Sequence, residues 1–291
     1  MSHALLDPAF ARELEALRRR MQIRARSGGG GDHLAKRRGG SAEFQEHRPY
    51  APGDDLRRID WLAFARTGEP VFKLFRAEED VIVRLVVDGS ASLEAGTPSK
   101  LDTAKRMAAS IAYMALGDSE RAQILTASDG LTRVSEPTRG RAGLPKVLRE
   151  LDAITPRGGT DLAKAIDAVL LRSPRPGMLV IVSDFMDPGP FDQAISRAAS
   201  AGHDVALVQV LAYEEVHPDW DGDLAFEDAE TGAIVEVTVD GAAVEAYLAR
   251  LHTLFLAMRG LAKRHRAVYV RTTTTEPTIA AVRRFVSRTV D

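Results

Sequence analysis

The chain has 291 residues, of which 45% are hydrophobic and 27% charged, and its formal net charge is −2. These values are typical of a soluble globular protein and give no overall reason to expect nucleic acid or an anionic membrane as partner. The sequence contains no cysteine, which excludes disulfides, thiolate metal ligands and a cysteine nucleophile. No apolar run approaches the roughly 18 to 20 residues that span a bilayer, and no signal peptide is visible at the start. We therefore expect a cytoplasmic protein without a membrane span.

The first unit, residues 1–27, is predicted to be an amphipathic helix. Asp7 followed by Pro8 is a typical helix start, with a carboxylate at the cap and proline in the first turn. Apolar residues then recur at spacings of three and four, which gives one apolar stripe: Phe10, Leu14, Leu17 and Met21. We expect the helix to run to about Arg26 and the glycines at 28–31 to form a flexible joint.

Residues 28–80 form a second segment, rich in charges and aromatic rings between Glu43 and Trp61. Its most distinctive residues are Arg48, Tyr50, Asp54, Asp55, Arg58, Asp60 and Trp61. Two interpretations are open: a clamp that packs this segment on the rest of the chain, which we favour, or direct contact with a partner. Val71–Arg76 alternates apolar and basic residues like a half-exposed strand. We expect it to pair, antiparallel, with the strand at 81–87.

From residue 81 to residue 291 the pattern is α/β. Apolar runs typical of buried strands are Val81–Val87, Ala122–Thr126, Met178–Val182, Asp204–Leu211 and Ala267–Arg271. Helical periodicity separates them, and a hairpin insertion is expected near 223–239. Strands that alternate with helices indicate a doubly wound, mostly parallel sheet with helices on both faces. Nearby, an acidic loop is expected to be solvated: Glu214, Glu215, Asp219, Asp221 and Asp223.

Polar side chains follow the predicted strands at the edge where such folds bind ligands. Asp88, Ser90 and Ser92 follow the first buried strand, Thr160 lies in a glycine-rich loop, and Asp184 follows another buried strand. Two carboxylates and three hydroxyls are hard oxygen donors, which suit Mg²⁺ or Mn²⁺. Asp161 and Ser183 are candidates for contacts that support these ligands. The alternative is that Asp88 and Ser90 merely cap the helix that follows.

The order Asp-Xaa-Ser-Xaa-Ser, threonine loop, later aspartate resembles the metal-ion-dependent adhesion site of von Willebrand factor A domains. The segment Glu43–Trp61 resembles the signature of the bacterial domain-of-unknown-function family 58, as do Gly158–Leu162 and Ser183-Asp184-Phe185. The resemblance covers about residues 28–291. It implies a non-enzymatic von Willebrand-type domain over residues 81–291, in which bound Mg²⁺ captures an acidic residue of a protein partner. It also implies work with MoxR-type AAA+ ATPases in assembling or activating other proteins.

A second hypothesis is a metal-dependent phosphoryl-transfer enzyme or phosphatase with Asp88 as nucleophile. Such chemistry usually requires a second acid two residues further on, where this chain has Ser90. The sequence also shows no well-placed lysine, and Gly158-Gly159 lacks the lysine of a phosphate-binding loop. The binding module is therefore the favoured function.

Overall fold

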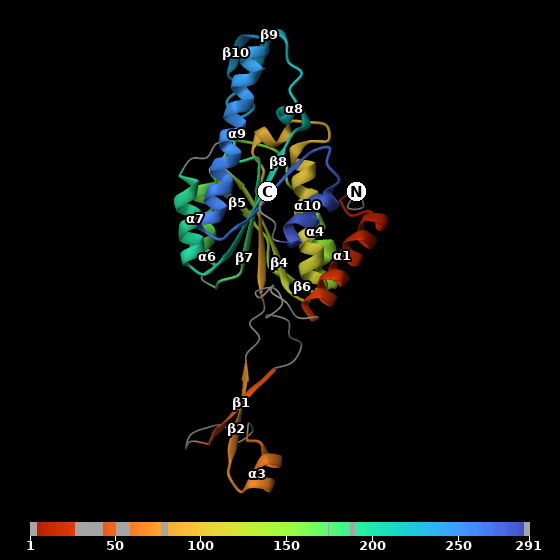
Figure 1. Ribbon diagram of the computed structural model, residues 1–291, viewed down its shortest axis with the longest axis vertical. Coiled ribbons are helices and arrows are strands. Elements are labelled where there is room, and N and C mark those ends of the chain that lie inside the picture. The colour runs from red at the N-terminus through yellow and green to blue at the C-terminus, as the bar shows by residue number, and fades with distance from the viewer. Residues whose placement is uncertain are drawn as a thin grey trace. The chain divides into compact units, whose positions relative to one another are not determined.

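The computed structural model (Figure 1) describes residues 5–26, 43–50, 59–76, 81–173, 175–186 and 190–287. At 20–26, 43–47 and 72–76 it describes the backbone only. Contacts divide the chain into two units, residues 1–22 with 81–291, and residues 23–80. The glycine joint at 28–31 and the motif residues Asp54, Asp55 and Arg58 lie outside the described residues.

The smaller unit contains β1 (Glu43–Pro49), α3 (Trp61–Thr67) and β2 (Val71–Arg76). β1 and β2 pair antiparallel, with Arg48 opposite Phe72. The prediction that Val71–Arg76 pairs with the strand at 81–87 is therefore wrong. The physical reason is that both edges of that strand, β3 (Ile82–Asp88), are already hydrogen-bonded to parallel neighbours. Alternation along Val71–Arg76 indicated a strand but carried no information about its partner.

Helix α3 explains two of the motif residues in local terms. The Asp60 carboxylate accepts hydrogen bonds from the N–H groups of Leu62 and Ala63, both at 3.1 Å, so Asp60 caps the helix. Trp61, the first residue of α3, is 58% exposed and meets Phe64 edge-on. The clamp interpretation of this motif stays a prediction.

The larger unit is built on a mostly parallel sheet. Within the described residues its strands are β3, β4 (Arg121–Ser128), β5 (Gly130–Val134), β6 (Thr138–Arg139), β7 (Met178–Ser183), β8 (Asp204–Leu211) and β11 (Val268–Thr273). The strand order is β11-β8-β7-β3-β4-β5, with β6 also paired to β4. The first five are parallel to one another, and β5 and β6 run antiparallel to β4. This confirms the predicted α/β fold.

Helices cover both faces of the sheet (Figure 1). One face carries α1 (Pro8–Arg26), α4 (Lys100–Gly117), α5 (Leu144–Asp152) and α10 (Thr278–Ser287). The other carries α6 (Leu162–Arg172), α7 (Phe191–Ser200) and α9 (Gly241–Arg264). Alternate residues of β3 enter the two cores: Leu85 and Val87 face the first, and Val86 faces the second. A strand buried on both faces explains why its sequence is continuously apolar.

Two further features lie around this frame. The predicted insertion is an antiparallel hairpin of β9 (Gly222–Glu227) and β10 (Ile234–Val239). A short helix, α8 (Tyr213–Val216), follows β8 and was not predicted. In the part of the chain that the structure describes, every helix is too short or too polar to cross a membrane.

The buried position of β3 gives a first test. Leu85 is fully buried, whereas Leu171 at the end of α6 is 86% exposed. Leu85→Ala is expected to lower the free energy of unfolding by about 2 to 5 kcal/mol, because it removes buried methyl groups and leaves a cavity. Leu171→Ala, the matched control, is expected to change it by less than about 0.5 kcal/mol. Urea denaturation followed by circular dichroism measures both, and equal losses would contradict the buried position of β3.

Candidate functional site

The order in which strands are added to the sheet reverses at β3. The chain runs from β3 to β4 on one side and later places β7 on the other side of β3. Strand ends at such a switch point form the crevice in which open α/β sheets bind ligands. Asp88 ends β3, and Asp184 directly follows β7. The two aspartates are therefore brought to neighbouring strand ends by the fold itself.

Asp88 is fully buried and held from both sides. One carboxylate oxygen accepts the N–H of Ser90 at 2.9 Å, and the other accepts the hydroxyl of Ser183 at 2.6 Å. The hydroxyls of Ser90 and Ser92 lie 3.0 Å apart. Ser90 precedes the short 3-10 turn Ala91–Glu94, but its side chain makes no capping hydrogen bond there. The explanation of Ser90 as a helix cap therefore fails.

Two loops are joined by backbone hydrogen bonds beneath these side chains. The N–H of Gly89 donates to Ala127, the carbonyl of Gly89 accepts from Arg157, and the N–H of Ala91 donates to the carbonyl of Gly158. A Cβ on Gly89 would lie only 3.0 Å from a methyl of Thr126, so any side chain here would push Thr126 aside by a few tenths of an ångström. The loop that contains Thr160 is fixed in this way against the loop that contains Ser90 and Ser92.

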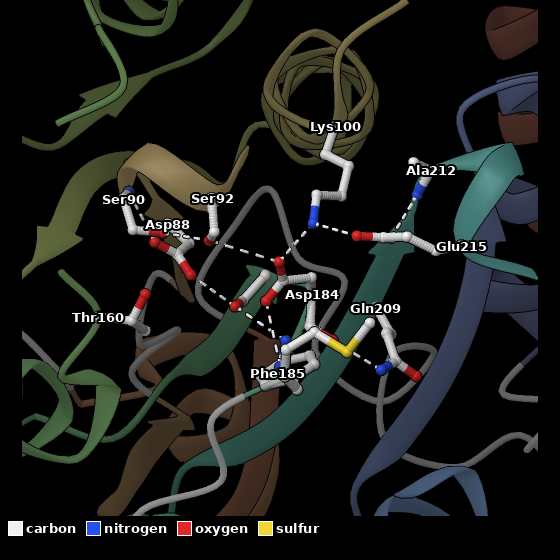
Figure 2. Close-up of polar contacts among 12 residues, drawn as sticks. Asp88, Ser90, Ser92, Lys100, Thr160, Asp184, Phe185, Gln209, Ala212 and Glu215 are labelled. Carbon is white, nitrogen blue, oxygen red and sulfur yellow. Dashed lines mark hydrogen bonds and ion pairs between the residues drawn. The ribbon is translucent and has the colours of Figure 1, made fainter. Parts of the chain in front are cut away.

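Asp184 is also buried and held at several atoms (Figure 2). Its backbone carbonyl accepts the Gln209 side-chain amide at 2.7 Å, and one carboxylate oxygen accepts the N–H of Met186 at 3.1 Å. The other carboxylate oxygen accepts the Ser92 hydroxyl at 3.4 Å. The Ser183 hydroxyl donates to Asp88 and accepts the N–H of Phe185, the residue after Asp184.

A buried lysine that sequence reasoning missed reaches the site. The Nζ of Lys100 lies 2.7 Å from Asp184 and 2.7 Å from Glu215, and Figure 2 shows it between the two carboxylates. The expectation that no lysine is well placed was therefore wrong. One signal was available, since Lys100 begins α4, where the helix dipole disfavours a positive charge.

Glu215 corrects a second expectation. It was assigned to a solvated acidic loop, but it lies on α8, with one carboxylate oxygen on Lys100 and the other accepting the N–H of Ala212 at 2.7 Å. The unpredicted helix α8 brings it there. Lys100 therefore joins the helix α4 to the ends of β7 and β8.

The remaining predicted residues come from the glycine-rich loop. Figure 2 shows the Thr160 side chain on the same side of the site as Asp88 and Ser90. The Thr160 hydroxyl donates to Glu230 at 2.7 Å. The Asp161 carboxylate accepts the N–H of Lys164 at 2.8 Å and so caps α6. Of the two residues predicted to support the ligands, Ser183 contacts the predicted ligand Asp88, whereas Asp161 caps α6.

The charges in the site are unbalanced. Burial, and then the charge of Asp184, raise the pKa of Asp88 to about 6, although the hydrogen bonds from Ser183 and Ser90 act in the opposite direction. Burial alone would lower the pKa of Lys100, but the charges of Asp184 and Glu215 outweigh it and raise that pKa. One ammonium therefore serves two carboxylates, and Asp88 has no cation of its own within this cluster.

The donor chemistry fits a hard cation. Among the described residues no three histidine, aspartate or glutamate side chains gather into a metal-binding group, and the site has two carboxylates. Two buried carboxylates with serine and threonine hydroxyls match the oxygen ligands of Mg²⁺ and Mn²⁺. A cation here would also offset both causes of the raised pKa of Asp88, its burial and the charge of Asp184.

The raised pKa of Asp88 predicts a pH-dependent stability in metal-free protein. Because the folded state holds the Asp88 proton more tightly than the unfolded state, with a pKa of about 6 against 3.8, ionised Asp88 costs stability as the pH rises from about 4 to 6. Asp88→Asn is expected to unfold with up to roughly 3 kcal/mol more free energy than wild type at pH 8, and with no difference near pH 4.

Urea denaturation in EDTA at several pH values measures this difference. The matched control is Asp152→Asn, at an exposed position at the end of α5, which is expected to show no such trend. A stability difference that stays constant between pH 4 and pH 8 would speak against the raised pKa.

Lys100 gives a separate prediction. Lys100→Met is expected to lower the free energy of unfolding by about 3 to 5 kcal/mol, because Asp184 and Glu215 then lie close together without a buried cation. Lys263→Met, at an exposed position on α9, is expected to cost less than about 0.5 kcal/mol. Thermal and urea unfolding measure both, and similar values would show that Lys100 adds little.

Comparison with known proteins identifies the family. Residues 46–253 match the family described as "Protein of unknown function DUF58". The chain is 37% identical over 242 residues to the uncharacterized proteins Rv1480 of Mycobacterium tuberculosis and Mb1516 of Mycobacterium bovis, a stretch that covers 81% of this chain and 76% of each relative.

Solved structures with a similar fold are more distant. BatB from Bacteroides thetaiotaomicron has a TM-score of 0.48 and 18% identity, covering 72% of this chain and 98% of that one. A von Willebrand factor type A protein from Catenulispora acidiphila has a TM-score of 0.42 and 11% identity, covering 75% of this chain and 44% of that one. Likenesses of this size say nothing about function. The family match and the two mycobacterial relatives, by contrast, extend over most of the sequence, and the chain belongs to the DUF58 family.

Proposed function

We propose that this protein is a non-enzymatic, metal-dependent protein-binding module. In this proposal Mg²⁺, or Mn²⁺, is held by Asp88, Ser90, Ser92, Thr160 and Asp184 and captures an acidic side chain of a partner, as in a metal-ion-dependent adhesion site. The observation that carries the proposal is the pair of buried aspartates at adjacent strand ends. Burial, and then the charge of Asp184, raise the pKa of Asp88 to about 6.

The charge balance favours capture of an external carboxylate. Asp184 already has Lys100 as a cationic partner at 2.7 Å, so it offers a bound metal only part of its negative charge. The serine and threonine hydroxyls are neutral donors. A divalent cation held in this way keeps net positive charge, which attracts an acid from outside.

The same geometry argues against Asp88 as a nucleophile. Asp88 is fully buried, and both of its carboxylate oxygens accept hydrogen bonds from within the chain. The lysine of the site lies on Asp184 and Glu215. These restraints suit a ligand that is held still, whereas a nucleophile must approach a substrate atom.

The resemblance of the sequence motifs supports a partner class. We propose that the partner is a MoxR-type AAA+ ATPase, a client protein that offers a carboxylate, or both, in the assembly or activation of other proteins. Such an ATPase requires ATP, so we place the pair in the cytoplasm. The net charge of −2 gives nucleic acid no electrostatic advantage as a partner.

Metal binding tests the proposal directly. Wild-type protein is expected to bind Mg²⁺ in isothermal titration calorimetry, and Asp88→Ala to weaken binding by more than about 100-fold, because even residues behind metal ligands typically contribute 10- to 100-fold. Asp152→Ala removes an exposed aspartate and is expected to bind like wild type.

Capture of a purified MoxR-type ATPase of the same organism supplies the second readout. We expect binding in Mg²⁺ that EDTA abolishes. Equal capture with and without EDTA, or Mg²⁺ binding that Asp88→Ala leaves unchanged, would refute the metal-dependent mechanism.

A further inference from the structure

One predicted ligand already contacts an acidic side chain of its own chain. The Thr160 hydroxyl donates to a carboxylate oxygen of Glu230 at 2.7 Å. Glu230 lies 70 residues further along the chain, in the turn between β9 and β10. An acidic side chain at this threonine has the same chemistry as the partner group that the proposed site would capture.

The turn that carries Glu230 has a fixed backbone. The Asp228 carboxylate accepts the N–H groups of Glu230 and Thr231, each at 2.9 Å. These two hydrogen bonds lower the pKa of Asp228, and the larger effect comes from the N–H of Thr231. The N–H of Gly232 donates to the Asp228 carbonyl, and the N–H of Asp228 donates to Ala233. The turn is therefore closed on itself, and the backbone of Glu230 is held in place.

The loop of the site has room for this carboxylate. A Cβ at Gly159 would lie 3.2 Å from the second carboxylate oxygen of Glu230 and 2.9 Å from the Asp129 carboxylate. The absence of a side chain at 159 thus leaves space beside Thr160 that Glu230 occupies. An incoming carboxylate near Thr160 would meet the negative charge of Glu230 in that space.

Strand β9 of the hairpin is tied, through aromatic contacts, to the opposite side of the site. Trp220 packs on Phe226 of β9 and on Tyr247 of α9, with ring centroids 5.4 and 5.1 Å apart. The Tyr247 hydroxyl donates to the carbonyl of Glu215 at 3.0 Å, and Glu215 holds Lys100.

The strands between base and tip are exposed, with Ile234 at 64% and Val235 at 58%. A two-stranded hairpin with so little buried surface has low local stability. Its tip can therefore leave Thr160 without disturbing the core of the sheet.

We propose that Glu230 is an internal acidic ligand of the site, which the carboxylate of a partner must displace. The hairpin is then a gate that closes the site in the absence of a partner. This inference rests on the proposed function, because it takes the Thr160 side of the site as the place where an external acid binds. If the gate is closed nine-tenths of the time, it weakens the apparent affinity for an external acid about tenfold.

Two titrations of the full chain test the gate with opposite expected signs. Glu230→Ala removes a carboxylate close to the metal and is expected to weaken Mg²⁺ binding roughly threefold in calorimetry. The same variant is expected to bind N-acetyl-L-glutamate about tenfold more tightly than wild type in saturating Mg²⁺, followed by NMR. Glu227→Ala, which removes an exposed glutamate from the same hairpin, is the matched control and is expected to change neither affinity.

The result separates the gate from the site beneath it. Equal N-acetyl-L-glutamate affinity for Glu230→Ala and wild type, with Mg²⁺ binding still lost in Asp88→Ala, overturns the gate and leaves the proposed function standing. Mg²⁺ binding that is unaffected by Asp88→Ala overturns both. The gate is supported only if Glu230→Ala shows both shifts, weaker Mg²⁺ binding and tighter N-acetyl-L-glutamate binding. Circular dichroism confirms that each variant is folded.

Discussion

Two carboxylates buried at adjacent strand ends are the constraint on which the rest of this site depends. Asp88 and Asp184 are placed there by the topology, since β3 and β7 are neighbours in the sheet. Burial withholds the water that would otherwise stabilise their charges. Groups of the protein replace that water: hydroxyl donors on Asp88, backbone donors on both aspartates, and an ammonium on Asp184.

The negative charge of the two aspartates is only partly compensated, and this favours a role in binding a cation. Lys100 is shared by Asp184 and Glu215, so the cluster stays negative when Asp88 is ionised. Evolution of a stable core would instead replace such a group by an apolar one, because unpaired buried charge is costly. A site that retains an unpaired buried charge gains affinity for a cation, since the bound cation supplies the missing positive charge.

The sequence allowed the sheet edge to be predicted, because each relevant strand is an apolar run that ends in an aspartate. The residues contributed by one strand and its own loop were therefore visible: Asp88, Ser90 and Asp184. Lys100 and Glu215 were not, since Lys100 lies 84 residues from Asp184 and 115 from Glu215; the place of Lys100 at the start of α4 marked it as unusual but did not reveal its partners. The partner of β2 was missed for the same reason, as a strand's alternation determines its faces and not its neighbour.

The hairpin illustrates how an insertion can gain control over a site without belonging to the core. Its strand β9 is attached through Trp220 and Tyr247 to Glu215, and its turn reaches Thr160. Lys100 lies between Glu215 and Asp184, so the insertion is connected to this charged cluster through Trp220 and Tyr247 and reaches Thr160 directly. The contacts of Trp220 are aromatic, with Trp220 and Tyr247 half-buried, whereas the contact between Glu230 and Thr160 is an exposed hydrogen bond. A change in charge at the site therefore acts first on the contact between Glu230 and Thr160, because an exposed hydrogen bond contributes less to stability than packed aromatic rings.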